Sequence, residues 1–111
     1  MFPGKSLDNS IPSTINVSIV GNSMEPTLHH GDEVSFEEFG TQNLRMGDII
    51  LCYHPFIKNK RIVKRVINII KEQHIYIRGD NSNESSDSRS FGPINKNKII
   101  AILKAKNVRK I

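Results

Sequence analysis

The sequence predicts a mainly β fold, a compact core of curled antiparallel sheets or a small barrel with little helix. The chain has 111 residues, which suits one domain with a modest core. Its apolar residues are mostly Ile and Val, which favour strands. They occur in short runs that are separated by Gly, Pro and polar turns, as in all-β domains.

Each expected strand ends at a turn signal. The first alternates polar and apolar residues up to Gly21, the second closes at Gly40, and the third is an apolar run stopped by Pro55. The expected strands cover residues 16–20, 33–39, 48–54, 60–70, 74–78 and 99–106.

The segment 60–70 is the longest regular run, and its β-branched residues favour a strand over a helix. The turn at 71–73 then predicts a hairpin with 74–78. Strand alternation places one set of side chains on the same face, namely Ile62, Lys64, Val66, Asn68 and Ile70.

Three segments fall outside this pattern. Residues 1–13 read as a flexible arm, so a single folded domain is expected over 14–111. Residues 22–28 form a turn or the start of a short helix, in which Pro26 could take an early position. Residues 79–93 form a long polar loop.

The net charge of +5 allows contact with nucleic acid or with an anionic membrane surface. The Lys and Arg residues are spread along the chain among Ile and Val, which indicates the solvated faces of strands. A basic β-barrel that binds nucleic acid is the alternative from another functional class, but the five Phe and two Tyr are scattered and give no stacking surface. No nucleic-acid partner is therefore expected.

Other features of the sequence bear on the cysteine, the location and the cofactors to be expected. Cys52, the one cysteine, lies in an apolar run and predicts a buried structural thiol. No stretch has the length of a transmembrane segment and no secretory signal opens the chain, so a cytoplasmic location without an anchor is expected. Adjacent His29 and His30 are poorly placed to chelate one metal, and no nucleotide-binding motif occurs, so neither metal nor cofactor is expected.

Ser23 and Lys64 are the candidate reactive pair. Ser23 follows a strand and a glycine, which exposes its hydroxyl at a turn, although a turn serine can equally cap a helix. Lys64 lies mid-strand between Val63 and Arg65, where burial would favour the neutral amine that can act as a base, although a solvated strand lysine is the simpler reading.

Three boxes in order resemble those of signal-peptidase-I-type (S26-type) serine proteases, which use a Ser-Lys dyad. They read Ser23-Met24-Glu25-Pro26-Thr27-Leu28, then Lys64-Arg65-Val66, then Gly79-Asp80-Asn81 with Ser85-Ser86-Asp87-Ser88-Arg89. The resemblance runs from about residue 19 to 92 and implies a signal-peptidase-like catalytic core.

The resemblance also implies roles for single residues. Ser23 would attack the scissile carbonyl, with Lys64 as its base and the Ser23 N–H as an oxyanion donor. Ser85 would orient the lysine. The remaining roles are a salt bridge between Asp87 and Arg89, a site-shaping loop at Asp80 and Asn81, and substrate contacts from Met24, Ile19, Val20 and the strand 48–54.

Two departures from the family pattern stand out. Gly21 replaces a residue that in some members supplies a second oxyanion hydroxyl. No Gly-Leu-Pro-Gly-Asp follows the lysine box, and the short stretch 66–78 leaves no room for an inserted second domain.

Among such proteases, the small anchorless ones that resemble this chain are the nickel-type superoxide dismutase maturation proteases. The precursor of nickel-type superoxide dismutase, from which such a protease removes a short N-terminal leader, is thus the expected partner. A general signal peptidase acting on exported preproteins is the alternative. A LexA/UmuD-type self-cleaving regulator fits less well, because the early Pro3-Gly4 is a poor match to such cleavage sites.

Overall fold

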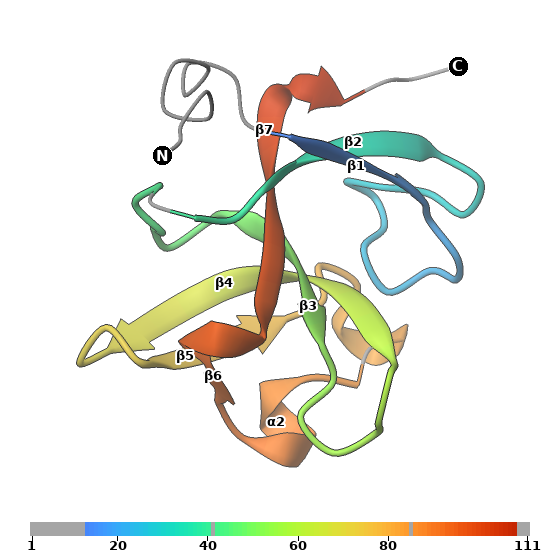
Figure 1. Ribbon diagram of the computed structural model, residues 1–111. Coiled ribbons are helices and arrows are strands. Elements are labelled where there is room, and N and C mark those ends of the chain that lie inside the picture. The colour runs from blue at the N-terminus through green and yellow to red at the C-terminus, as the bar shows by residue number, and fades with distance from the viewer. Residues whose placement is uncertain (1–12, 41, 85, 109–111) are drawn as a thin grey trace, which may run out of the picture.

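Seven antiparallel strands form one curled sheet in the computed structural model, which describes residues 13–40, 42–84 and 86–108 (Figure 1). The order across the sheet is β1-β2-β7-β3-β4-β5-β6. The strands are β1 Thr14–Ser18, β2 Glu33–Glu38, β3 Ile49–Tyr53, β4 Arg61–Ile70, β5 His74–Arg78, β6 Ile94–Asn95 and β7 Ile99–Val108.

Strand β7 joins the two parts of the sheet. It pairs with β2 on one side and with β3 on the other, so Leu103 faces both Phe36 and Ile49 in the register. Figure 1 shows β7 running between the β1–β2 hairpin and the β4–β5 hairpin, which lie at opposite ends of the fold. The last strand of the chain therefore holds the first hairpin beside the middle of the sequence.

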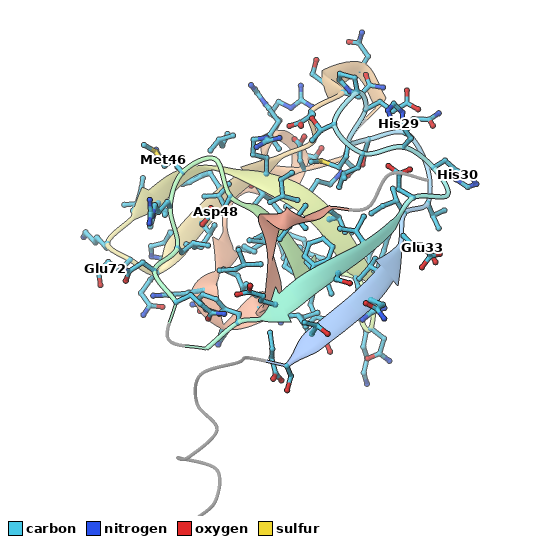
Figure 2. The ribbon with its side chains drawn as sticks, turned by 90° about the horizontal axis from the view of Figure 1, so that it is seen from above. His29, His30, Glu33, Met46, Asp48 and Glu72 are labelled. Atoms are coloured by element: carbon cyan, nitrogen blue, oxygen red, sulfur yellow. The ribbon has the colours of Figure 1, made fainter. Side chains whose placement is uncertain are left out.

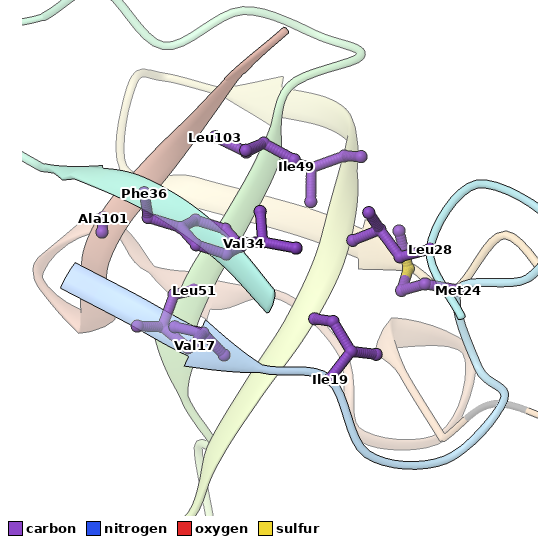
Figure 3. Packing of buried hydrophobic residues seen from close by; sticks show 10 residues of the cluster. All are labelled: Val17, Ile19, Met24, Leu28, Val34, Phe36, Ile49, Leu51, Ala101 and Leu103. Atoms are coloured by element: carbon purple, nitrogen blue, oxygen red, sulfur yellow. The ribbon is translucent and has the colours of Figure 1, made fainter. Parts of the chain in front are cut away.

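Each face of the curled sheet carries its own apolar cluster. Along β3, Ile49 and Leu51 enter the first cluster, whereas Ile50 and Cys52 enter the second. Burial on both faces explains why this strand is continuously apolar instead of alternating. Figure 3 shows the first cluster, whose buried members are Val17, Ile19, Met24, Leu28, Val34, Phe36, Ile49, Leu51, Ala101 and Leu103.

The face predicted for residues 60–70 is wrong beyond Val66. The register of β4 against β5 shifts between Val66 and Asn68, because an extra residue interrupts the ladder there. From this bulge onward the alternation reverses: Ile69 packs on the second cluster, while Asn68 and Ile70 are exposed. Ile62, Lys64 and Val66 do share one face, as predicted.

The other predictions from the sequence agree with the fold, with local differences. The mainly β class and the 71–73 turn are confirmed, but β1 ends at Ser18, two residues before the predicted end at Val20. Residues 22–28 are turns without a helix. The polar loop 79–93 contains two short helices, η1 Ser82–Glu84 and α2 Ser88–Phe91, and β6 and η2 Lys96–Lys98 follow it, also unpredicted.

The predicted flexible arm, apart from Ser13, lies outside the described residues. Within the described ranges, no helix has the length and apolar character needed to cross a membrane.

We expect Phe36→Ala to lower the free energy of unfolding by about 3–5 kcal/mol, because it empties a fully buried ring site between β2 and β7. Urea unfolding measures this. Phe56→Ala is the matched control, since the Phe56 side chain is 75% exposed and should change stability by less than about 0.5 kcal/mol. Equal losses in both variants would contradict the packing described here.

Candidate functional site

Ser23 lies in a loop between β1 and β2 whose base is closed by backbone hydrogen bonds. The Ile19 N–H donates to the Asp32 carbonyl at 2.9 Å, and the Gly31 N–H donates to the Ile19 carbonyl at 2.8 Å. Gly21 has a φ of +85°, a conformation that favours glycine, and its N–H donates to His30 Nδ1 at 3.0 Å. We call residues 21–28 the serine loop.

Two apolar anchors hold the serine loop against the fold. Met24, with 2% of its surface exposed, and the fully buried Leu28 both enter the first apolar cluster (Figure 3). The Leu28 N–H donates to the Met24 carbonyl at 2.9 Å, which closes the turn between them. Ser23, immediately before the first anchor, remains half-buried at the surface of the loop.

The segment that follows β5 also holds the serine loop. The Asn81 backbone N–H donates to the Ser23 carbonyl at 2.9 Å, and Asn81 Nδ2 donates to the Asn22 carbonyl at 3.1 Å. Asp80 accepts a hydrogen bond from the Thr27 hydroxyl. Asp80 and Asn81 therefore contact the serine loop at both ends.

Asp80 also links this segment to β4. Arg65 donates from Nε to Asp80 Oδ1 at 2.8 Å and from Nη2 to Oδ2 at 2.7 Å, a bidentate pair, and its Nη1 donates to the Gly47 carbonyl at 2.7 Å. The hydrogen bonds from Arg65 are the main reason that the pKa of Asp80 is lowered, and the Thr27 hydroxyl adds to this against the opposing effect of burial. The sequence did not single out Arg65 or Thr27, although both lie inside the boxes.

Lys64 is buried in the middle of β4, with 5% of its surface exposed. It pairs with Ile50 of β3, on the face that also carries Cys52 and Val66. Burial lowers the pKa of the Lys64 amine; the charges of Asp87 and of the Cys52 thiolate form oppose this, whereas those of Lys60 and Arg89 add to it. Burial likewise raises the pKa of Cys52 to about 12. The prediction that this thiol is buried is confirmed.

Asp87 is the second buried ionisable group near Lys64. Its Oδ2 accepts the Gly79 N–H at 3.0 Å, and its Oδ1 accepts the Arg89 N–H at 3.1 Å, which caps α2. The expected ion pair with Arg89 is present, at 2.9 Å between Nε and Oδ1. Arg89 also donates to the Ser82 carbonyl at 3.0 Å, so the pair ties η1 to α2.

Ser23 and Lys64 line the same cleft, which has a volume of about 610 Å³. One wall comes from residues 17–20 at the end of β1, and the other from Ile57 and residues 59–64 in the β3–β4 loop and β4. Met24, Leu51, His54 and Ser86 complete the lining.

Two strand edges border this cleft. β1 is the terminal strand of the sheet, and β4 pairs with β5 only from Arg65 onward, so in the described residues 61–64 have a strand on one side only. Open edges of this kind can accept an extended peptide as an added strand.

Ile19, Val20 and Met24, the predicted substrate contacts, all line the cleft, and so do Leu51 and His54 from the predicted strand 48–54. Val20 is 80% exposed, whereas Ile19 and Met24 are buried and supply floor and support. Residues 57–61 were missed, because nothing in a turn sequence says which cavity it borders. Ser85 lies outside the described residues.

The labelled histidines and carboxylates lie in different parts of the molecule. Figure 2 shows His29 and His30 at one end of the molecule and Asp48 and Glu72 towards the other. In the ranges that the structure describes, no three His, Cys, Asp or Glu residues gather in a way that could hold a metal ion.

Comparison with known proteins identifies the family. Residues 4–104 match the sequence profile described as Peptidase S24-like. The chain belongs to this family. It is also 30% identical over 95 residues to human (Homo sapiens) mitochondrial inner membrane protease subunit 1, covering 67% of this chain and 57% of that protein.

Two further relatives are of the same kind. Identity to Arabidopsis thaliana mitochondrial ATP-independent inner membrane protease subunit 1a is 29% over 111 residues, covering 78% of this chain and 65% of the relative. Identity to Mus musculus mitochondrial inner membrane protease subunit 2 is 28% over 99 residues, covering 68% and 57%. This peptidase-family chain thus spans less than two thirds of the length of these relatives.

We expect Asp80→Asn to lower the free energy of unfolding by about 1–3 kcal/mol at pH 7, because Arg65 loses its charged partner. The pKa of Asp80 is lowered by folding. Its contribution is therefore present above the unfolded-state pKa of about 4 and is lost as the pH falls through the lower folded-state pKa.

Urea unfolding at pH 7 and at successively lower pH checks this. The control is Glu72→Gln, which changes an exposed carboxylate in the β4–β5 turn. A difference between wild type and Asp80→Asn that stays constant at acid pH would refute the assignment.

Proposed function

We propose that the chain is a serine endopeptidase in which Ser23 is the nucleophile and Lys64 the general base. The observation that carries this proposal is that a surface-loop serine and a buried lysine with a lowered pKa line one cleft. A neutral amine is a competent base for a serine hydroxyl, and burial is the means by which a protein makes a lysine neutral. Membership of a peptidase family supports the same reaction.

In this mechanism, neutral Lys64 takes the proton from the Ser23 hydroxyl as Oγ attacks the scissile carbonyl carbon. The resulting lysine ammonium gives that proton to the leaving amine when the C–N bond breaks, which leaves an acyl-enzyme. Lys64 then takes a proton from water, whose oxygen attacks the ester, and returns it to Ser23 Oγ. The Ser23 N–H is the proposed donor to the oxyanion, and Gly21 contributes no side-chain donor.

The substrate is proposed to bind as an extended strand between the wall 17–20 and the wall 57–64. Backbone hydrogen bonds to the open edges would hold the peptide in register with Ser23. Val20 and Met24 would contact its side chains on the Ser23 side. Because both edges belong to the sheet, the scissile bond would be presented by rigid elements.

The remaining predicted residues have supporting roles in this proposal. Asp80 and Asn81 position the serine loop through Thr27 and the Ser23 carbonyl. The Asp87–Arg89 pair holds α2 and η1 close to Lys64. Ser85 would orient the Lys64 amine, and Ser85→Ala should then reduce turnover more than stability.

For the substrate, we propose a precursor protein from which an N-terminal leader is removed, with the nickel-type superoxide dismutase precursor as the first candidate and the cytoplasm as the location. The second candidate is an exported or membrane-bound precursor. The relatives named as mitochondrial inner membrane protease subunits favour that second candidate.

Ser23→Ala and Lys64→Met should each lower kcat/KM at least about a thousandfold, because one lacks the nucleophile and the other the base. Lys64→Ala should also be inactive. Lys64→Arg should fail as well, since arginine stays protonated. Glu72→Gln, in the exposed β4–β5 turn and outside the cleft lining, is the control and should keep wild-type activity.

Circular dichroism would confirm that the inactive variants are folded. Robust cleavage by Lys64→Arg would overturn the base assignment.

The value of kcat/KM should rise with pH through the pKa of Lys64 and then level off, because only the neutral amine accepts a proton. That rise should come below the pH at which an ordinary lysine titrates, because burial lowers the pKa of Lys64. A profile that is flat between about pH 5 and 9 would contradict the mechanism.

The substrate is tested by incubating wild type and Ser23→Ala with a nickel superoxide dismutase precursor, and by reading product masses. One N-terminal truncation by wild type alone supports that substrate. No cleavage, followed by processing of an exported precursor in the presence of lipid, supports the second candidate.

A further inference from the structure

His54 directly follows β3 and organises the loop that forms one wall of the cleft. Its Nδ1 accepts two backbone hydrogen bonds, from the Phe56 N–H at 3.0 Å and from the Ile57 N–H at 3.1 Å. The loop is closed by the His54 N–H donating to the Lys60 carbonyl at 2.8 Å and by the Lys60 N–H donating to the Ile57 carbonyl at 3.3 Å. One ring nitrogen thus fixes the conformation of the first half of this loop.

The His54 ring is itself held by aromatic packing. Its centroid lies 4.8 Å from that of Phe91, edge to face, and 6.5 Å from that of Phe56. Phe91 ends α2, the helix capped by Asp87. His54 therefore connects the cleft wall to the segment beside Lys64, and it lines the cleft itself.

The two accepted hydrogen bonds define the protonation state of His54. A ring nitrogen that accepts must carry a lone pair, so the imidazole is neutral and bears its proton on Nε2. The charged groups acting on the ring are Lys60 from the loop and Lys64 from β4, and the packed neighbours Phe56 and Phe91 are apolar. Burial first, and then these two lysines, lower the pKa of His54.

We propose that neutral His54 is a positioning residue that holds the 57–61 wall in place for peptide binding, through the Phe56 and Ile57 amides. The role in peptide binding rests on the proposed peptidase function, whereas the role in the loop does not. Protonation would place an N–H on Nδ1 of His54, where it would face the N–H groups of Phe56 and Ile57. Three donors would then meet without an acceptor. The wall would then loosen as the pH falls through the pKa of His54.

Two substitutions distinguish the effect of the hydrogen-bond acceptor of His54 from the effect of its ring packing. His54→Asn keeps an acceptor oxygen near the place of Nδ1, whereas His54→Phe keeps a ring to pack on Phe91 but accepts nothing. His74→Asn is the control, because His74 is exposed on β5 and lies outside the cleft lining.

The first arm of the test needs no substrate. In ¹⁵N–¹H spectra recorded from about pH 4 to 8, the Phe56 and Ile57 amides of wild type should shift together with the titration of His54. Those shifts should be absent in His54→Asn and unchanged in His74→Asn. The proposal would be overturned if these two amide signals did not shift as His54 titrates, or if they kept their wild-type positions in His54→Phe.

The second arm measures cleavage of the precursor that wild type processes. His54→Phe should raise KM about tenfold, from the loss of two hydrogen bonds, with kcat changed by less than about twofold. His54→Asn should stay near the wild-type KM at pH 7 and lose the rise in KM that wild type shows at acid pH.

Equal KM values for His54→Phe and wild type would refute the role in binding. If wild type cleaves neither precursor, the proposed function fails, and the spectra still decide whether His54 holds the loop.

Discussion

The bidentate ion pair between Arg65 and Asp80 is the interaction on which the candidate site depends. Arg65 follows Lys64 in β4, and Asp80 precedes the residue that binds the Ser23 carbonyl. Through Thr27 and Gly47, the same pair reaches the serine loop and the turn before β3. Segments far apart in the chain are thereby held in one arrangement. Two adjacent charge-assisted hydrogen bonds constrain the angle as well as the distance between their elements.

The burial of Lys64 opposes stability and favours the neutral amine. An amine held among apolar side chains loses hydration, which disfavours the ammonium form. The fold tolerates this because Lys64 pairs with Ile50 in a sheet whose β3 and β7 cluster residues are almost wholly buried. The charge of Asp87 raises the pKa of Lys64, whereas the charges of Lys60 and Arg89 lower it further. The basicity of this amine thus reflects several neighbours at once.

Local patterns in the sequence predicted most of the strands. The apolar run of β3, Gly40 after β2 and the 71–73 turn each carry their own signal, so these elements agree closely with the structure. The bulge after Val66 could not be predicted, because an extra residue in a ladder leaves no mark in a run of Ile and Val. β6 has two residues and pairs with β5 only through the tertiary fold.

The residues of the candidate site were likewise predicted only in part. Ser23, Lys64, Asp80 and Asn81 were predicted because their order matches a family, and they do come together around one cleft and loop. Nothing in the sequence indicates the role of His54, because its partners are backbone amides that any sequence supplies. Interactions made by the main chain are the ones that residue types reveal least.

The open edges of β1 and β4 carry a consequence for the choice of target. A segment can add to an edge only while its own amides are free, and amides inside a folded domain are already paired. Cleavage of a folded protein at this cleft would therefore be governed by the free energy of local opening in the target, which is near zero at frayed termini and largest in cores. If the chain is the proposed peptidase, this discrimination would act before any side chain of the target is recognised, and it would confine cleavage to tails, linkers and chains that have not yet folded.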